Sequence, residues 1–175
     1  EEAPHQDVEG KLYYVRYPLK QRTENREQKT EKKSKSVICH LSSVNYIVVA
    51  TTRPETMLGD TAVAVNPKDK RFKKLIGETV ILPLMEREIK IISDDFVDPK
   101  FGTGLVKVTP AHDPNDYQMG LRHKLEFVNI LNPDATLNKN TGKYCGLDRF
   151  KAREAVLEDL KQKNLIEKIE EHAHA

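Results

Sequence analysis

Short apolar runs alternate with polar stretches along most of the chain, which is the pattern of a protein built mainly from strands. Residues 10–19 alternate and are rich in Tyr and Val, and Pro18 ends this run. Residues 45–52 and 79–84 are enriched in β-branched side chains, which favour strands. The pattern therefore predicts strands in residues 10–19, 36–41, 45–52, 61–67, 79–84, 87–97, 102–110 and 127–131.

Other segments predict helices. Residues 68–77 indicate a short helix that ends at Gly77. Residues 114–125 indicate a second one, because Asp113 suits the N-cap and Pro114 the first helical position.

The longest predicted helix covers residues 148–163, where apolar side chains recur near the 3.6-residue period. Asp148 can cap it, and its apolar face comprises Phe150, Val156, Leu157 and Leu160. Strands together with these helices predict an α+β fold, with a strand-rich, curved or barrel-like sheet and peripheral helices.

The composition is that of one globular domain. The chain has 175 residues, of which 38% are hydrophobic and 32% charged, and a chain of this length can bury a sizeable core. The net charge of +2 supplies no global field that would attract nucleic acid. Residues 20–36 contain no apolar residue and predict an exposed, mobile loop whose basic side chains could contact phosphates weakly.

The cysteines and the chain ends bear on location. Cys39 and Cys145 form neither a CxxC nor a Cys–His metal pattern, so we expect free thiols in a reducing compartment, the cytoplasm. No apolar stretch approaches the ~20 residues that span a bilayer. Residues 1–10 lack the plan of a signal peptide. The ends of the chain indicate a piece of something longer.

Polar side chains crowd the segment that follows the strand predicted at 45–52. Within six positions the sequence places Thr51, Thr52, Arg53, Glu55 and Thr56. Each threonine alone is an ordinary strand or turn residue, but a plain turn does not need so many hydrogen-bonding groups. The density indicates one wall of a binding pocket, stiffened by Pro54.

A second polar cluster lies in residues 107–116. Lys107 and Thr109 share one face of a strand, and Asp113 and Asp116 share one face of the first helical turn, where the helix dipole favours ionised carboxylates. An ammonium, a hydroxyl and two carboxylates suit a small zwitterionic ligand that carries a hydroxyl group.

A purely structural explanation of these residues stays open. Asp113 can serve only as a helix cap, Asp116 as a first-turn carboxylate and Lys107 as a surface residue of an edge strand. A metal site at His112 is disfavoured because no second His or Cys lies at a ligand spacing. Covalent catalysis has no support, since no Gly-x-Ser-x-Gly elbow appears and neither cysteine has a base nearby in sequence.

Three long blocks are the most specific part of the sequence: YIVVATTRPETMLGDTAVAVNPKD, DPKFGTGLVKVTPAHDPNDY and GLDRFKAREAVLEDL. In this order they resemble the editing domain inserted into the Rossmann catalytic core of class I aminoacyl-tRNA synthetases, in its valyl form. The resemblance runs from Lys11 to the last predicted helix, apart from the loop 20–36. Glu55, Lys107 and Thr109 favour the valyl form over the leucyl and isoleucyl forms.

The resemblance implies an aminoacyl-tRNA deacylase that acts on threonyl-tRNA(Val), with threonyl-adenylate as a further candidate substrate. A pocket built for valine cannot strongly reject the near-isosteric threonine; this is an established property of valyl-tRNA synthetases, not a result from this chain. No metal or organic cofactor is implied. The implied partners are the 3′ end of tRNA(Val) carrying threonine and the catalytic core of the synthetase, with no membrane partner and a monomer as the default state.

The resemblance also implies roles for site residues. Asp116 would hold the substrate α-ammonium, and the side-chain hydroxyl would be recognised by Lys107, Thr109 and Asp113. Arg53 and Thr56, with backbone amides near them, would position the terminal adenosine or its phosphate and the attacking water. Thr52 is a further implied substrate-binding residue. The implied catalytic residues are Thr56, Asp113 and Asp116.

Alternatives stay open at this stage. The domain could edit in the leucyl or isoleucyl manner, or it could bind the aminoacylated 3′ end without hydrolysing it. A structural spacer whose editing has decayed is a third alternative, against which the presence of Lys107, Thr109, Asp113 and Asp116 argues.

Overall fold

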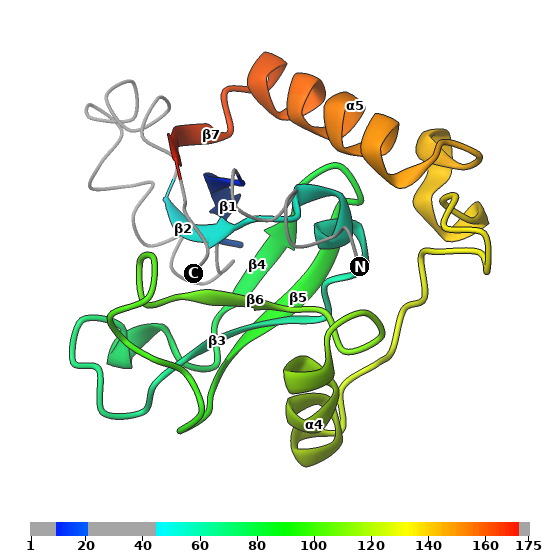
Figure 1. Ribbon diagram of the computed structural model, residues 1–175. Coiled ribbons are helices and arrows are strands. Elements are labelled where there is room, and N and C mark those ends of the chain that lie inside the picture. Colours follow the sequence, from blue (N-terminus) through cyan, green and yellow to red (C-terminus); the bar gives the residue numbers. More distant parts are fainter. Residues whose placement is uncertain (1–9, 21–44, 172–175) are drawn as a thin grey trace, which may run out of the picture.

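The computed structural model describes residues 10–20 and 45–171, which form strands in two sheets with helices at the periphery (Figure 1). One sheet is antiparallel, and its order β2–β1–β7 is made by Tyr46–Thr51, Lys11–Pro18 and Ile166–Glu171. The other has the order β4–β5–β3–β6, with Thr79–Leu82, Arg87–Ser93, Ala62–Val65 and Val106–Val108. In this second sheet β3 and β5 run parallel, whereas the other neighbours are antiparallel.

The two sheets are joined where β1 ends. The Lys20 N–H donates to Thr79 O at 2.8 Å, and Leu19 forms a bridge with Val80. On the other side, the loop before β6 returns to β2, where the Thr103 hydroxyl donates to the backbone oxygen of Val48 at 2.5 Å. The strands therefore wrap around a common interior without closing a barrel. The expected strand-rich, curved α+β fold is confirmed.

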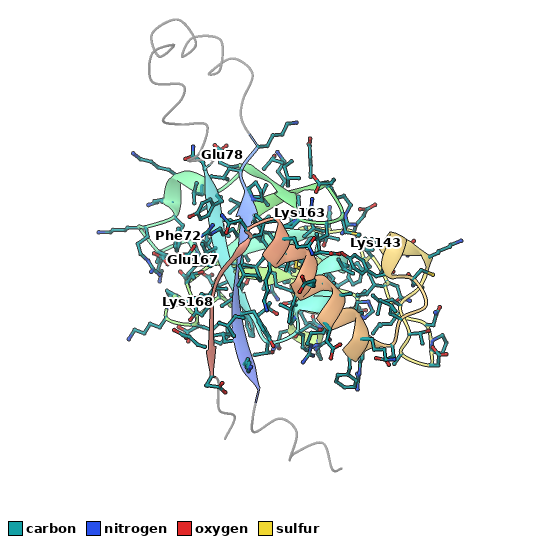
Figure 2. All side chains as sticks on the ribbon, turned by 90° about the horizontal axis from the view of Figure 1, so that it is seen from above. Phe72, Glu78, Lys143, Lys163, Glu167 and Lys168 are labelled. Carbon is teal, nitrogen blue, oxygen red and sulfur yellow. The ribbon has the colours of Figure 1, made fainter. Side chains whose placement is uncertain are left out.

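The main apolar core is shared by both sheets, the 3₁₀ helix η2 (Pro54–Gly59) and the long helix α5 (Arg149–Gln162). Its completely buried members include Val15, Val49, Leu58, Val63 and Leu160. Beside α5 lie Lys163, its C-cap residue, and Lys143, which pairs with Asp159 of the helix at 2.9 Å (Figure 2).

Helix α4 (Pro114–His123) begins as the sequence predicts. The Asp113 side chain accepts hydrogen bonds from the N–H groups of Asn115 and Asp116, and Pro114 occupies the first turn. At the other end of the helix, the buried Asp94 carboxylate binds Arg122 and His123 at 2.9 Å. In Figure 1, α4 and α5 lie at opposite ends of the molecule.

Two expected elements are absent from the described part of the chain. Residues 68–77 form turns and the short 3₁₀ helix η3 (Lys73–Leu75), because the Asp69 carboxylate takes the backbone N–H of Arg71 at 3.1 Å and competes with helical hydrogen bonds. Residues 127–131 form no strand beyond an isolated bridge at Leu131, because side chains take their backbone groups: Asn138 and Asn140 donate to Asn129 O.

Other expectations differ in detail. Strand β7 was not expected, since it carries alternating charges such as Glu167 and Lys168, which are labelled on it in Figure 2. In α5, Val156 and Leu160 are buried as predicted, but Phe150 is 55% exposed. A further 3₁₀ segment, η4 (Lys139–Tyr144), lies in the stretch expected to form turns. The expected strand 36–41 and the loop from residue 21 onward lie outside the described residues.

None of the helices within residues 10–20 and 45–171 has the length and apolar character needed to cross a bilayer.

The two faces of α5 should differ sharply in stability. We expect Leu160→Ala to lower the free energy of unfolding by ~2–5 kcal/mol, because Leu160 is completely buried. The matched variant Phe150→Ala should cost no more than ~1 kcal/mol, since Phe150 is 55% exposed and its ring contacts the cations of Arg149 and Arg153. Urea unfolding measures both, and equal losses would contradict the observed packing face.

Candidate functional site

A cavity of about 180 Å³ opens between the end of β2, η2, β6 and the first turn of α4. The residues that line it are Ala50, Thr51, Thr52, Arg53, Thr56, Phe101, Val106, Lys107, Thr109, His112, Asp113 and Asp116. The two polar clusters of the sequence, 51–56 and 107–116, thus meet in one hollow. Every residue to which the resemblance gives a role in the site lies in its wall.

The first wall is built by the turn that follows β2. Its N–H groups are satisfied locally: the Arg53 N–H donates to the Thr51 hydroxyl at 3.0 Å. Pro54 starts η2 with its fixed φ. Both the backbone N–H and the hydroxyl of Thr56 then donate to Arg53 O, at 3.0 and 2.9 Å. The hydroxyl proton of Thr56 is therefore used within the turn.

Glu55 belongs to the crowded segment but not to the cavity. It is only 3% exposed and accepts two hydrogen bonds from Arg153 of α5, at 2.8 and 3.1 Å. Removing one partner of such a buried pair costs ~3–5 kcal/mol. Glu55 therefore ties η2, and with it Thr56, to the opposite helix.

Lys107 of β6 lies at the centre of the site. Its ammonium contacts Thr109 Oγ1 at 2.5 Å, Thr56 Oγ1 at 3.1 Å and Asp60 Oδ1 at 3.1 Å. An ammonium has three protons, so each of them has an acceptor inside the protein. The side chain is 10% exposed, and it holds the two walls of the cavity together.

Asp60 is a functional candidate that the sequence analysis missed. It is completely buried, and Tyr17 donates to its Oδ2 at 2.6 Å, while Thr109 donates to its Oδ1 at 2.7 Å. Burial raises the pKa of Asp60, and the Lys107 ammonium and the two hydroxyls oppose that rise. We assign an ionised carboxylate, since all these partners can donate to it. The signal in the sequence was an acidic residue two positions before the apolar strand Ala62–Val65, since carboxylates are rarely buried unless paired.

Asp116 faces the same cavity from α4. Its Oδ2 accepts a hydrogen bond from the Thr109 N–H at 2.9 Å. Burial raises the pKa of Asp116 to about 6; the Thr109 hydrogen bond and Lys107 oppose the rise, and the charges of Asp113 and Asp60 add to it. The helix N-terminus favours the charged form of Asp116, but burial outweighs it in setting the direction of the pKa shift; with a pKa of about 6 the carboxylate is still ionised at neutral pH, as expected.

His112 supports the rim of the cavity. Its Nε2 accepts a hydrogen bond from the Ile130 N–H at 2.9 Å, which assigns the ring proton to Nδ1. Burial lowers the pKa of His112, and the charges of Arg53 and Lys107 lower it further, so the ring is neutral. The segment it holds packs on Gly59, where a Cβ atom would lie 2.9 Å from Val128 O. Among the residues described, no group of three His, Cys, Asp or Glu side chains is arranged to hold a metal ion.

Comparison with known proteins decides the family. Residues 70–174, more than half of the chain, match the family described as "Leucyl-tRNA synthetase, editing domain". The chain belongs to this family of synthetase editing domains. The curated proteins to which the chain is similar are of the valyl type.

Curated relatives of the editing domain are valine–tRNA ligases. The protein of Petrotoga mobilis is 54% identical over 175 residues, which are 100% of this chain and 18% of that protein. That of Thermotoga maritima is 51% identical, with the same coverage, and that of Carboxydothermus hydrogenoformans is 52% identical over 99% of this chain and 17% of its own length. The chain thus spans about a fifth of the length of these relatives, and the expected resemblance to the valyl editing domain is confirmed.

A solved structure supports the same fold. The structure entitled "The crystal structure of GlLeuRS-CP1" superposes with a TM-score of 0.64, covering 93% of this chain and 99% of that one, at 17% sequence identity. At this identity the likeness shows the fold of the editing domain only.

The raised pKa of Asp116 predicts a specific pH dependence. The folded chain binds this proton more tightly than an unfolded chain, in which an Asp has a pKa near ~3.9. The Asp116 contribution to the free energy of unfolding therefore falls as pH rises from about 4 through the folded value of about 6. The Asp116→Asn variant should lack this fall.

Carboxyl-carbon NMR measures the titration directly, with Asp94 as the internal control. The hydrogen bonds from Phe96, His123 and Arg122 hold the pKa of Asp94 below its usual value although burial opposes them. The Asp116 carboxyl should titrate near 6, and the Asp94 carboxyl below the usual value of an aspartate. An Asp116 midpoint in the ordinary range near ~4 would contradict the assigned burial.

Proposed function

We propose that this editing domain hydrolyses the ester of threonyl-tRNA(Val) and spares valyl-tRNA(Val). The observation that carries the proposal is the single small cavity in which an ammonium, a hydroxyl and two carboxylates meet. The relatives are valine–tRNA ligases, which points to tRNA(Val) as the tRNA and to threonine as the amino acid that must be removed. A synthetic site for valine cannot strongly reject threonine, an established property of valyl-tRNA synthetases, so a second site must select the hydroxyl.

The substrate α-ammonium pairs with Asp116. The Thr109 N–H holds Oδ2 of this carboxylate in place, and Asp116 lines the cavity. Its pKa of about 6 leaves it ionised at neutral pH, as this pairing requires. In a valyl ester the ammonium is the same, so Asp116 serves both affinity and catalysis but does not distinguish the two amino acids.

The substrate hydroxyl is recognised by Thr109 and Asp113, with Lys107 behind them. Because Thr109 donates its proton to Asp60 and accepts from Lys107, it offers the substrate an acceptor. Both capping N–H groups of α4 bind Oδ1 of Asp113, so Oδ2 is not used by the cap. The threonine hydroxyl therefore acts as a donor. A hydroxyl has one proton to donate, so valine would leave one of these acceptors unpaired, at ~1–3 kcal/mol.

The hydrolysis needs positioning more than a strong nucleophile. Water attacks the ester carbonyl carbon, the bond to the ribose oxygen breaks, and threonine and the tRNA hydroxyl end are released. Arg53, Thr52 and Thr56 form the wall that positions the terminal adenosine and this water, and the ester is already activated. Thr56, Asp113 and Asp116 are the proposed catalytic residues, because they would contact the reacting groups.

The wider setting belongs to the same proposal. The chain acts as an insertion in a cytoplasmic synthetase, whose catalytic core and tRNA-binding parts supply the remaining contacts to tRNA(Val). Its net charge of +2 fits a domain that binds only the 3′ end. Threonyl-adenylate is a second substrate of the same pocket, and the domain works as a monomer within that synthetase.

Deacylation tests the proposal. The chain, and in parallel a valine–tRNA ligase that carries it, is incubated with threonyl- and valyl-tRNA(Val), and the loss of each ester is followed. We expect faster loss of the threonyl ester and at least ~100-fold slower loss in Asp116→Ala, because the variant lacks the charge partner of the ammonium. The matched control is Asp134→Ala, which removes an exposed carboxylate. This variant should hydrolyse both esters at the rates of the parent.

The outcomes separate the alternatives. Protection of the ester by the chain without turnover, with turnover in the ligase, would favour a fragment that only binds the 3′ end. Loss of neither ester in either protein would refute the proposed function. With tRNA(Leu) and tRNA(Ile) added as further substrates, faster loss of a mischarged ester on either of them would move the domain to the leucyl or isoleucyl editing type.

Lys107 should contribute more to the preference for the threonyl ester than to the affinity for tRNA(Val). In Lys107→Met, Thr109 and Thr56 lose their shared donor, so we expect the preference for the threonyl over the valyl ester to fall about tenfold, equivalent to ~1.4 kcal/mol. Affinity for uncharged tRNA(Val) should change far less. Competition binding and deacylation measure the two quantities, and equal losses for both esters would remove Lys107 from hydroxyl recognition.

A further inference from the structure

We propose that Asp60 is a positioning residue of the editing site: it is the internal counter-ion that holds the Lys107 ammonium against the floor of the cavity and so keeps Asp116 open for the substrate ammonium. The role of Asp116 in this statement rests on the proposed function. The arrangement of the three side chains does not.

Asp60 acts from behind the cavity wall. It is completely buried and is not among the residues that line the cavity, so it does not touch the substrate. Its Oδ1 lies 3.1 Å from the Lys107 ammonium and accepts the Thr109 hydroxyl at 2.7 Å. Both side chains that Oδ1 contacts are lining residues. Asp60 therefore controls the cavity only through Lys107 and Thr109.

Asp60 itself is held from other elements. Tyr17 of β1 donates to its Oδ2 at 2.6 Å. Arg87, at the start of β5, donates to the backbone oxygen of Asp60 at 2.6 Å and to that of Leu58 at 3.3 Å. The Asp60 N–H donates to Met57 O at 3.0 Å. The carboxylate is therefore a fixed point, towards which the longer and more flexible Lys107 side chain is drawn.

Without this fixed point, Lys107 would find another carboxylate. Asp116 lines the same cavity and already responds to the charges of Lys107 and Asp60. A buried ammonium that loses its partner must pair again or lose its charge. Pairing with Asp116 would fill the place of the substrate ammonium. The native network prevents this because each Lys107 proton already has an acceptor.

Other charged groups around the network do not substitute for Asp60. Asp113 caps α4, and Arg53 donates to His112 O at 3.4 Å at the rim. Burial lowers the pKa of His112, so its ring is neutral. Tyr17 stays protonated, since burial and the Asp60 charge raise its pKa well above the usual value. Of the groups facing Lys107 in the described chain, Asp60 is the one that contacts the ammonium as a carboxylate.

The test is the variant Asp60→Asn, which keeps the shape and removes the charge. In the chain without substrate, carboxyl-carbon NMR should show the Asp116 midpoint falling from about 6 by about one unit or more, as Lys107 turns towards it. The matched control is Asp94→Asn, which removes another buried, ion-paired aspartate at the far end of α4. It should lower stability and leave the Asp116 midpoint unchanged.

Deacylation supplies a second readout. With Asp116 occupied by Lys107, Asp60→Asn should raise KM for threonyl-tRNA(Val) about tenfold, more than it changes kcat. In the Lys107→Met background the same substitution should add less than about twofold, because Asp60 acts through Lys107. If Asp60 had only a structural role, the losses caused by the two substitutions would add. The folded Asp60→Asn variant would then keep the KM of the parent.

An unchanged Asp116 midpoint in folded Asp60→Asn overturns this inference, whatever the activity. A shifted midpoint in a chain whose parent hydrolyses no ester, alone or in the ligase, leaves the inference standing and refutes the proposed function. If Asp60→Asn does not fold, the lysine-nitrogen NMR signal of the parent decides. The Lys107 signal should stay nearly constant while Asp116 ionises near 6; a Lys107 signal that follows the Asp116 titration overturns the inference.

Discussion

The contact on which the site depends is the buried ion pair between Asp60 and Lys107. A carboxylate taken completely out of water must have all its acceptor positions occupied, or its desolvation would destabilise the fold by several kcal/mol. Asp60 meets this condition only when Tyr17 of β1 and Thr109 and Lys107 of the β6 segment converge on it. The electrostatic requirement of one side chain thus sets how the two sheets meet beneath the cavity.

A second buried pair completes this arrangement. Glu55, near the start of η2, binds Arg153 of α5, whereas Asp60, just after its end, binds Lys107. The short helix is thus held between two carboxylates that face different partners. Such pairs add little net stability compared with apolar packing, but they define one geometry. For a wall that must hold Thr56 within hydrogen-bond distance of Lys107, a defined geometry is the relevant gain.

The sequence predicted the residues of the cavity better than the residues that hold them in place. The reason is the distance along the sequence between the interacting residues. The cavity residues stand in two dense local clusters, and Asp113 and Asp148 cap helices through N–H groups two or three residues away. The supports join distant positions instead: Tyr17 and Asp60 are 43 residues apart, and Glu55 and Arg153 are 98 apart. Local patterns carry no information on such pairings. The failed strand at 127–131 has the same origin, since distant side chains take its backbone groups.

The hydrogen bonds of the network fix which groups of the cavity can accept a proton from a ligand. Lys107 donates all its protons inward, and the hydroxyl protons of Thr109 and Thr56 go to Asp60 and to Arg53 O. What these groups present to a ligand is therefore acceptor capacity, reinforced by the carboxylates of Asp113 and Asp116. A ligand must bring protons of its own: an ammonium and a hydroxyl do so, but a methyl group does not. In the proposed function the selectivity follows from protons already committed within the protein, so a change behind the wall would alter recognition through the wall.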